Sequence, residues 1–230
     1  MKQIVTKGIV LARTNYGEAD RIVTLLTPDQ GKLRLMVRGA RKSKSKLAGG
    51  IELFSVSDIT FIRGKADIGT MISARLHKHY GNIVQDLDRT MLGYELIKQL
   101  NKAIEDVPEP EYFTLLEQAF EALDASKVPL ELIQAWFRAQ LLKYAGHTPN
   151  LQRDTTGQVL ATNQSYGFSF DDMAFTRDSN GRFDATRIKL LRLLFSDNSP
   201  LKIAQVQGVS GLLPDVAPLL QAMARTYIRS

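Results

Sequence analysis

The chain has 230 residues, 44% of them hydrophobic, and a formal net charge of +6. This length suits one large domain or two small ones, and no apolar run approaches the roughly 20 residues of a membrane span. The absence of cysteine excludes disulfides and thiolate-bound metals, and the N-terminus Met1-Lys2-Gln3-Ile4 lacks the apolar stretch of a signal peptide, so we expect a cytoplasmic protein that does not associate with membranes.

Residues 1–80 alternate in short β-like runs, a pattern typical of a small barrel or sandwich. Turn residues separate the runs, as in Asn15-Tyr16-Gly17 and around Gly64. Five strands are predicted, at residues 3–14, 20–26, 32–38, 54–63 and 68–77. Five strands within this length indicate a barrel of the OB-fold type.

From Asp86 the hydrophobic period changes from two to about 3.6, which marks the start of a helical region. Helices are predicted from residue 86 to a stop before Pro108, and at 111–123, 129–145, 185–195, 200–206 and 213–228. Between residues 147 and 183 the periodicity fades, which predicts an irregular loop with room for one short hairpin, inserted between helices. The expected fold class is α+β, with an OB-fold nucleic-acid-binding domain at 1–80 and a mostly α-helical domain at 81–230.

The positive charge is concentrated at one end of the chain. Residues 1–80 hold 15 Lys and Arg against 6 Asp and Glu, whereas residues 81–230 hold 15 against 18. Such an asymmetry favours a polyanionic partner, either nucleic acid or an anionic membrane. Membrane binding would need a basic amphipathic helix, and the basic region has the pattern of strands. The charge therefore favours nucleic acid.

The densest run of cations spans residues 31–46, which contain no acidic residue. Its strand portion places Leu33, Leu35 and Val37 on one face. The other face and the segment that follows it carry the candidate DNA-binding residues, which are Lys32, Arg34, Arg38, Arg41, Lys42, Lys44 and Lys46. From Arg41 onward the run is too polar to pack, so we expect a mobile loop that follows a phosphate backbone.

Further cations and aromatic residues bear on this surface. Four arginines of the β region could widen it, namely Arg13, Arg21, Arg63 and Arg75. Aromatic residues for base stacking are sparse, with only Tyr16, Phe54, Phe61 and Tyr80, so we expect weak sequence selectivity. The alternative is that the basic run is only an edge that keeps the protein soluble.

No catalytic or metal-binding motif is recognisable, so we expect neither an enzyme nor a cofactor. Phosphate-cradling loops, nucleophile elbows and zinc-protease helices are absent from the sequence. His77 and His79 lack a third ligand nearby, and the adjacent Asp171 and Asp172 have the pattern of a solvated turn.

The predicted helix at 129–145 offers a candidate partner-binding surface. Ile133, Trp136 and Phe137 share this helix and could line a groove for a partner peptide. The same spacing is more typical of a helix face packed in the core. Both interpretations stay open at the level of sequence.

Six short segments of the basic region follow one another in order, namely Gly8-Ile-Val-Leu11, Tyr16-Gly-Glu-Ala-Asp-Arg21, Leu25-Leu-Thr-Pro28, Gly31-Lys32, Arg38-Gly-Ala-Arg-Lys42 and Leu47-Ala-Gly49. Together they resemble the N-terminal signature of the RecO family of recombination mediators. The resemblance covers about the first 65 residues, and the later helical pattern agrees with that family. It implies an OB-fold followed by a helical domain.

The resemblance also implies a role in DNA repair and recombination after DNA damage. It implies binding of single- and double-stranded DNA, annealing of strands coated with single-strand-binding protein, and loading of the recombinase RecA together with RecR. Many relatives carry a four-cysteine zinc module after a segment matched here by Gly146-His-Thr-Pro-Asn-Leu151. Asp154 and Gly157 stand where the first cysteine pair is expected, so the insert should lack zinc. The alternative function is a protein-interaction adaptor whose basic loop serves only solubility.

Overall fold

The computed structural model describes residues 2–64, 67–104 and 107–228. The chain forms two compact units, Met1–Asp124 and Ala125–Ser230, and each is considered by itself. In the part of the chain that the structure describes, no helix has the length and apolar character needed to cross a bilayer.

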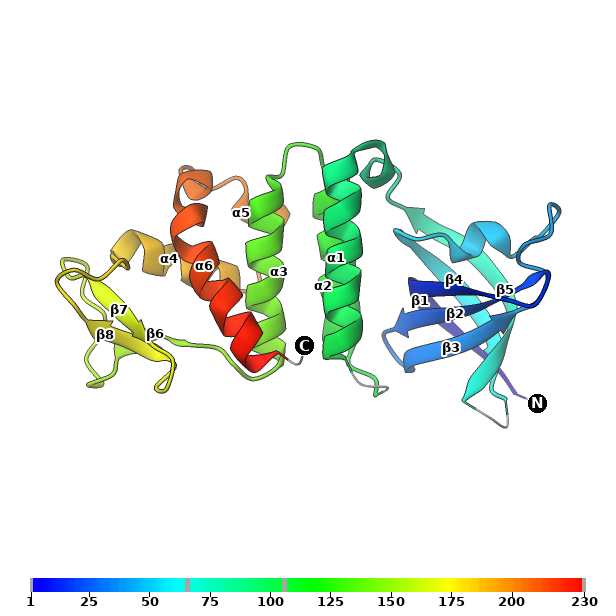
Figure 1. Cartoon of the computed structure of the whole chain (residues 1–230), viewed down its shortest axis with the longest axis horizontal. Helices are drawn as coiled ribbons and strands as arrows, with labels where there is room; N and C mark the ends of the chain where they lie inside the picture. Colours follow the sequence, from blue (N-terminus) through cyan, green and yellow to red (C-terminus); the bar gives the residue numbers. More distant parts are fainter. Residues whose placement is uncertain (1, 65–66, 105–106, 229–230) are drawn as a thin grey trace. The chain divides into compact units, whose positions relative to one another are not determined.

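The first unit begins with five strands that form an OB-like sheet (Figure 1). The strands are β1 (Gln3–Tyr16), β2 (Asp20–Thr27), β3 (Gly31–Val37), β4 (Ser55–Ile62) and β5 (Ile68–His79). Their order is β1-β2-β3-β5-β4, and β4 pairs back onto β1, so the sheet closes into a barrel. The predicted five-stranded OB-fold is therefore confirmed, with each strand within two residues of its expected bounds.

The barrel closes through a short parallel seam between β3 and β5. Only Arg34↔Ile68, Leu35↔Gly69 and Met36↔Thr70 pair along it. A Cβ atom on Gly69 would lie 2.8 Å from Leu35 Cδ2 and 2.9 Å from the Ile62 carbonyl oxygen, so the close approach of the strands requires glycine there. All other neighbouring strands in the barrel pair antiparallel.

The barrel core confirms the two-faced pattern predicted for β3. Leu35 and Val37 are buried with Val23, Leu25 and Phe61, and Leu33 packs against this cluster. Arg34, between them in sequence, is exposed. Alternation along the strand thus separates an apolar inner face from a cationic outer face.

Two helices, α1 (Leu87–Ala103) and α2 (Pro110–Asp124), belong to the same compact unit as the barrel. Their contact is aromatic, because the Phe54 ring meets Tyr94 and Phe120 edge to face at centroid distances of 5.3 and 5.5 Å. Gly93 of α1 lies so close to Phe54 that a Cβ atom there would be 2.6 Å from the ring. The Phe54 ring therefore packs against both helices, and the compact unit that contains the barrel and the helical pair ends at Asp124.

Tyr80 extends the aromatic contact and carries a perturbed hydroxyl. Its ring packs edge to face on Phe120, and its buried hydroxyl has no hydrogen-bond partner among the described residues. Burial raises the pKa of Tyr80 above the ordinary tyrosine range, and the nearby carboxylates of Glu117 and Glu121 add to this rise. The hydroxyl is therefore protonated throughout the physiological range.

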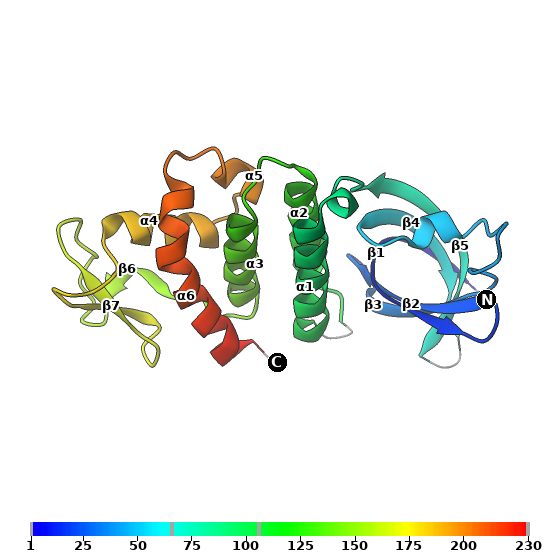
Figure 2. The same cartoon turned by 45° about the horizontal axis from the view of Figure 1, so that its top comes forward.

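The second unit contains the remaining helices and, at one end of them, the insert (Figures 1 and 2). The helices are α3 (Leu130–Tyr144), α4 (Ala185–Phe195), α5 (Pro200–Ile203) and α6 (Val209–Tyr227). The sequence predicts the start of the last helix at residue 213. The helix instead begins at Val209, after Gly208 at φ 82°, and holds Pro214 and Pro218 in its interior.

The insert is more ordered than the sequence predicts. Three short strands, β6 (Asn150–Asp154), β7 (Tyr166–Ser169) and β8 (Ala174–Arg177), form a sheet in the order β6-β8-β7. Tyr166, Phe175 and Phe183 pack together beneath it. The one short hairpin that the sequence allowed is present as β7 and β8, whereas the parallel pairing of β6 with β8 was not predicted. Strands of four or five residues are too short to show a clear period.

Asp154 organises this insert at the position where the resemblance places the first cysteine. Its buried carboxylate accepts hydrogen bonds from the Thr156 hydroxyl (2.6 Å), the Thr156 and Gln158 amides (both 3.0 Å) and the Arg177 guanidinium (3.2 Å). The bond from the Thr156 hydroxyl lowers the pKa of Asp154 most, and burial opposes it. A charged carboxylate thus joins β6 to the following turn and to β8.

Asp154→Asn should lower the unfolding temperature of the protein by several degrees at neutral pH. Because the pKa of Asp154 is lowered in the fold, its contribution is present above the unfolded-chain pKa of about 3.9 and is lost as the pH falls through the folded value. Thermal unfolding followed from neutral to acid pH tests this, with exposed Asp171→Asn as the control. Equal unfolding temperatures of wild type and Asp154→Asn at neutral pH would contradict it.

Candidate nucleic-acid interface

The outer face of β3 carries two of the candidate cations in different settings. Arg34 is exposed on the strand. Lys32 is half-buried, and its Nζ donates to the Ile104 carbonyl at 3.4 Å. Arg34 is therefore the cation of this strand that is open to a phosphate.

The turn after β3 is tied to the β1–β2 hairpin. The Arg41 amide donates to the Ala19 carbonyl (2.9 Å) and one Arg41 guanidinium nitrogen donates to the Gly17 carbonyl (3.2 Å). The Gly39 amide, at φ 65°, donates to the Asp20 carboxylate (2.7 Å). Turns in which the Lys42 amide donates to the Gly39 carbonyl and the Ser45 amide donates to the Lys42 carbonyl continue this segment, so the predicted loop has a defined course, while its mobility stays a prediction.

Most of the cations in this run are available for binding. Within the described ranges, the side chains of five of them are exposed and make no hydrogen bond or ion pair, namely those of Arg34, Arg38, Lys42, Lys44 and Lys46. Arg41 is also exposed and uses only one guanidinium nitrogen. We define these six residues as the basic strip. A row of unneutralised cations on one strand and its following turn is a surface suited to phosphate contacts.

Three of the four outlying arginines lie close to acidic or amide side chains of neighbouring strands and loops. Arg13 forms an ion pair with Glu52 at 2.8 Å, and Arg21 donates to the Asn15 side chain at 3.2 Å. Arg75 is exposed on β5, where it pairs in register with Asp58. Because Glu52 balances the charge of Arg13, Arg13 is the weakest of these three candidates for a phosphate contact.

Arg63, the fourth of these arginines, lies beside Arg34. Both line a cavity of about 160 Å³ at the β3–β5 seam, together with Asp67 and Gly69. Arg63 also donates to the Gln30 side chain at 2.8 Å. The structure thus places two cations from segments about 30 residues apart in sequence at one end of the seam, which no local motif indicates.

His77 of β5 has protein partners. His77 Nε2 lies 3.1 Å from Lys7 Nζ, and His77 Nδ1 lies 3.7 Å from the Asp58 carboxylate. Among residues 2–64, 67–104 and 107–228, no group of three or more His, Cys, Asp or Glu side chains is placed to hold a metal ion.

The candidate partner-binding residues of α3 are buried. Ile133, Trp136 and Phe137 are at most 2% exposed, and the Trp136 indole donates to the Asn198 carbonyl at 2.9 Å. This burial is what the core interpretation of the helix face predicts, and side chains so enclosed do not line an open groove.

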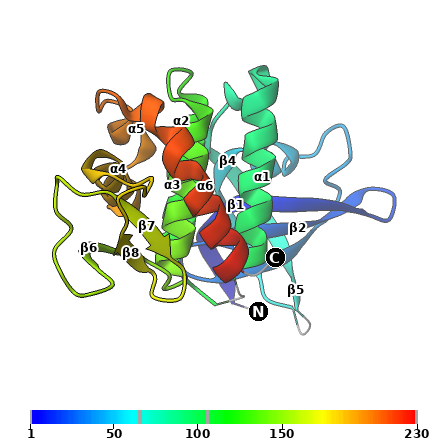
Figure 3. The same ribbon diagram turned by 60° about the vertical axis from the view of Figure 1, so that its left-hand side comes forward.

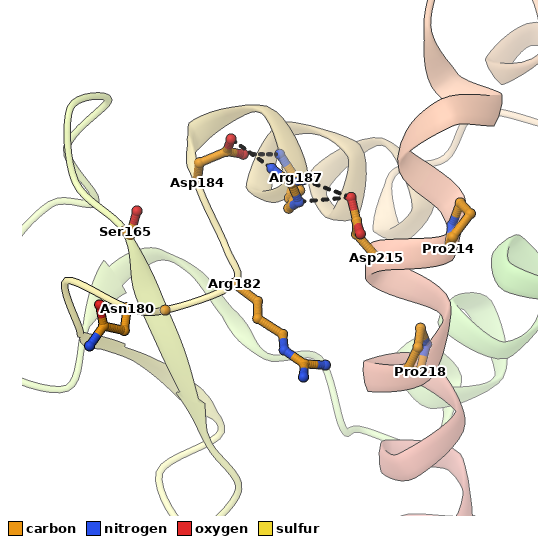
Figure 4. A pocket seen from close by; sticks show the side chains of 9 residues that line it. Ser165, Asn180, Arg182, Asp184, Arg187, Pro214, Asp215 and Pro218 are labelled. Carbon is orange, nitrogen blue, oxygen red and sulfur yellow. Dashed lines mark hydrogen bonds and ion pairs between the residues drawn. The ribbon is translucent and has the colours of Figure 1, made fainter.

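A larger cavity lies in the second unit, between the loop after β8 and α6 (Figure 4). Its volume is about 470 Å³. Arg187 bridges Asp184 and Asp215 at 2.7 and 2.8 Å, while Arg182 makes no hydrogen bond or ion pair with any described residue. Two arginines are balanced by two aspartates here, so the cavity does not favour a polyanion as the basic strip does.

Comparisons with known proteins cover nearly the whole chain. A family model described as Recombination protein O N terminal matches residues 1–80, and one described as Recombination protein O C terminal matches residues 84–205. A protein from Listeria welshimeri called DNA repair protein RecO is 30% identical over 82% of this chain and 76% of its own length.

Two proteins of the same name from strains of Dehalococcoides mccartyi are 34% and 36% identical, each over 64% of this chain. The match covers 58% of the length of each of these relatives, so this chain spans less than two thirds of them.

Proposed function

Because this chain belongs to the RecO family, we propose that it is a DNA repair protein that binds single- and double-stranded DNA through the barrel of residues 1–80. The observation that carries the proposal is the basic strip. Its six exposed cations follow one strand and a turn held against the β1–β2 hairpin. Phosphate contacts need such a row and need no base-specific geometry.

The basic strip would promote annealing of complementary strands. Two strands repel each other through their phosphates, and bound lysine and arginine side chains lower this repulsion. The cations lie on exposed side chains at the barrel surface, where a second strand can approach the first. This role requires binding and release only, with no catalytic step and no cofactor.

We propose that the protein acts on strands coated with single-strand-binding protein and assists the loading of RecA together with RecR. Membership in the RecO family supports this proposal. The helical region, residues 81–230, would provide the protein contacts, while residues 1–80 would provide the DNA contacts.

An annealing assay tests the proposal. Two complementary oligonucleotides with donor and acceptor dyes, each coated with single-strand-binding protein, should anneal faster when the protein is added. The acceleration should disappear as salt is raised, because phosphate contacts release counterions. Oligonucleotides lacking complementarity are the control for aggregation.

An unchanged annealing rate at low salt would overturn the annealing role. Absence of any salt-dependent binding to either strand would overturn the DNA-binding role itself, and it would favour an interaction adaptor whose basic turn serves solubility. The two outcomes are distinguishable because binding is measured separately, by fluorescence anisotropy.

A further inference from the structure

The aromatic side chains of the barrel region differ sharply in exposure. Residues 1–80 contain four, and Phe54, Phe61 and Tyr80 are each 1% exposed. Tyr16 is 55% exposed. Burial therefore removes three of them from contact with any ligand, and Tyr16 alone among the four presents an open ring.

Tyr16 lies on the same outer face as the cations of β3. It ends β1 at the tip of the β1–β2 hairpin, which extends beyond the other strands (Figure 3). Val23 and Leu35 point into the core, so strand alternation turns Tyr16, Ile22 and Met36 outward. Ile22 and Met36 pair in register and are half-buried. Ile22 and Met36 together form a small apolar patch beside the exposed ring of Tyr16.

Cations border this patch on two sides. Arg34 is two residues from Met36 on the outer face of β3, and Arg38 directly follows the strand. Tyr16 pairs with Asp20 on β2, and the pairing of Arg21 with Val37 places Arg38 about two strand spacings, roughly 10 Å, from Tyr16. The Asp20 carboxylate accepts the Gly39 amide, and Glu18 is the exposed acid of the hairpin tip.

We propose that Tyr16 stacks on an unpaired nucleobase of a strand whose phosphates contact Arg34 and Arg38. This inference rests on the proposed function and goes further, since it assigns a residue that distinguishes single from double strands. An aromatic ring beside unneutralised cations is the combination that binds single-stranded nucleic acid. In a duplex the base faces are already stacked, so the ring gives a preference for unpaired bases.

The test compares Tyr16→Ala and Tyr16→Phe on two ligands of equal length, a thymine oligonucleotide and a fully abasic strand with the same phosphates. Tyr16→Ala should weaken binding of the thymine strand about 5- to 150-fold, the range for loss of one stacked base. Tyr16→Phe should restore most of the affinity, since it keeps the ring. Both variants should bind the abasic strand like the wild type.

The matched control is Val5→Ala, which removes another exposed apolar side chain of β1. It should leave both affinities unchanged, and thermal unfolding of each variant shows that the barrel is intact. A wild type that binds both strands with strong salt dependence, together with Tyr16→Ala that binds the thymine strand equally well, overturns the stacking role alone. A wild type that binds neither strand overturns the proposed function.

Discussion

Single-strand binding should lose most of its salt dependence when the cations of the turn after β3 are removed, in the variant Arg38→Ala, Arg41→Ala, Lys42→Ala, Lys44→Ala, Lys46→Ala. With about five phosphate contacts, the wild-type affinity should fall with a log–log slope of about −3.5, or roughly 100-fold between about 50 and 200 mM salt. The variant keeps Arg34 alone of the basic strip, so its slope should approach about −0.7, the value for one contact.

The measurement is fluorescence anisotropy of a labelled oligonucleotide across a salt series. A control variant removes the same charge from exposed positions elsewhere, namely Lys98, Lys102, Lys127, Lys189 and Arg225. It should keep the wild-type slope, because only charges near the bound phosphates release counterions. If the salt dependence of the affinity falls equally in both variants, the net charge of the protein and not the basic strip governs binding.

The largest effect on stability is expected for Phe54→Ala. The Phe54 ring is 1% exposed and fills the space between Tyr94, Phe120 and Gly93, so its removal leaves a cavity between the barrel and the helical pair. Loss of a buried phenylalanine costs about 3–5 kcal/mol, a large share of a typical stability of about 5–15 kcal/mol. The backbone of Phe54 has φ 56°, and because phenylalanine and alanine both carry a Cβ atom this conformation disfavours them alike, so the change reports packing.

Urea unfolding measures the free energy of unfolding, and hydrogen exchange of peptides from β1–β5 shows whether the loss of stability occurs within the first unit. Leu87→Ala is the control, since Leu87 is 74% exposed on α1 and its loss should change stability by no more than about 0.5 kcal/mol. A small effect of Phe54→Ala would show that the barrel does not depend on its contact with α1 and α2.

The sequence predicts the barrel well because alternation is strong where one strand face is buried. Leu33, Leu35 and Val37 indicate both the strand and its inner face, and the structure agrees. The long helices are predicted equally well, because each buries one face and its apolar residues therefore recur with a period of about 3.6. The sheet of the insert was missed, since Tyr166–Ser169 and Ala174–Arg177 each contain only two residues per face.

The candidate interface was only partly predictable. The sequence locates the run of cations, but it does not reveal which of them are already neutralised. Arg13 and Glu52 are 39 residues apart, and their ion pair exists only because the barrel brings them together. The bond between Gly39 and Asp20 likewise joins the basic turn to the hairpin across 19 residues. Long-range pairings of this kind have no local sequence signal.

The parallel seam of the barrel has a consequence for motion. Its three residue pairs are far fewer than the seven that join β2 to β3, so local opening of the barrel should begin between β3 and β5. Arg34 stands on this seam and Arg63 borders it. A phosphate backbone that binds both arginines would link β3 to the segment after β4 across this seam. We therefore expect the barrel to be most rigid when DNA is bound.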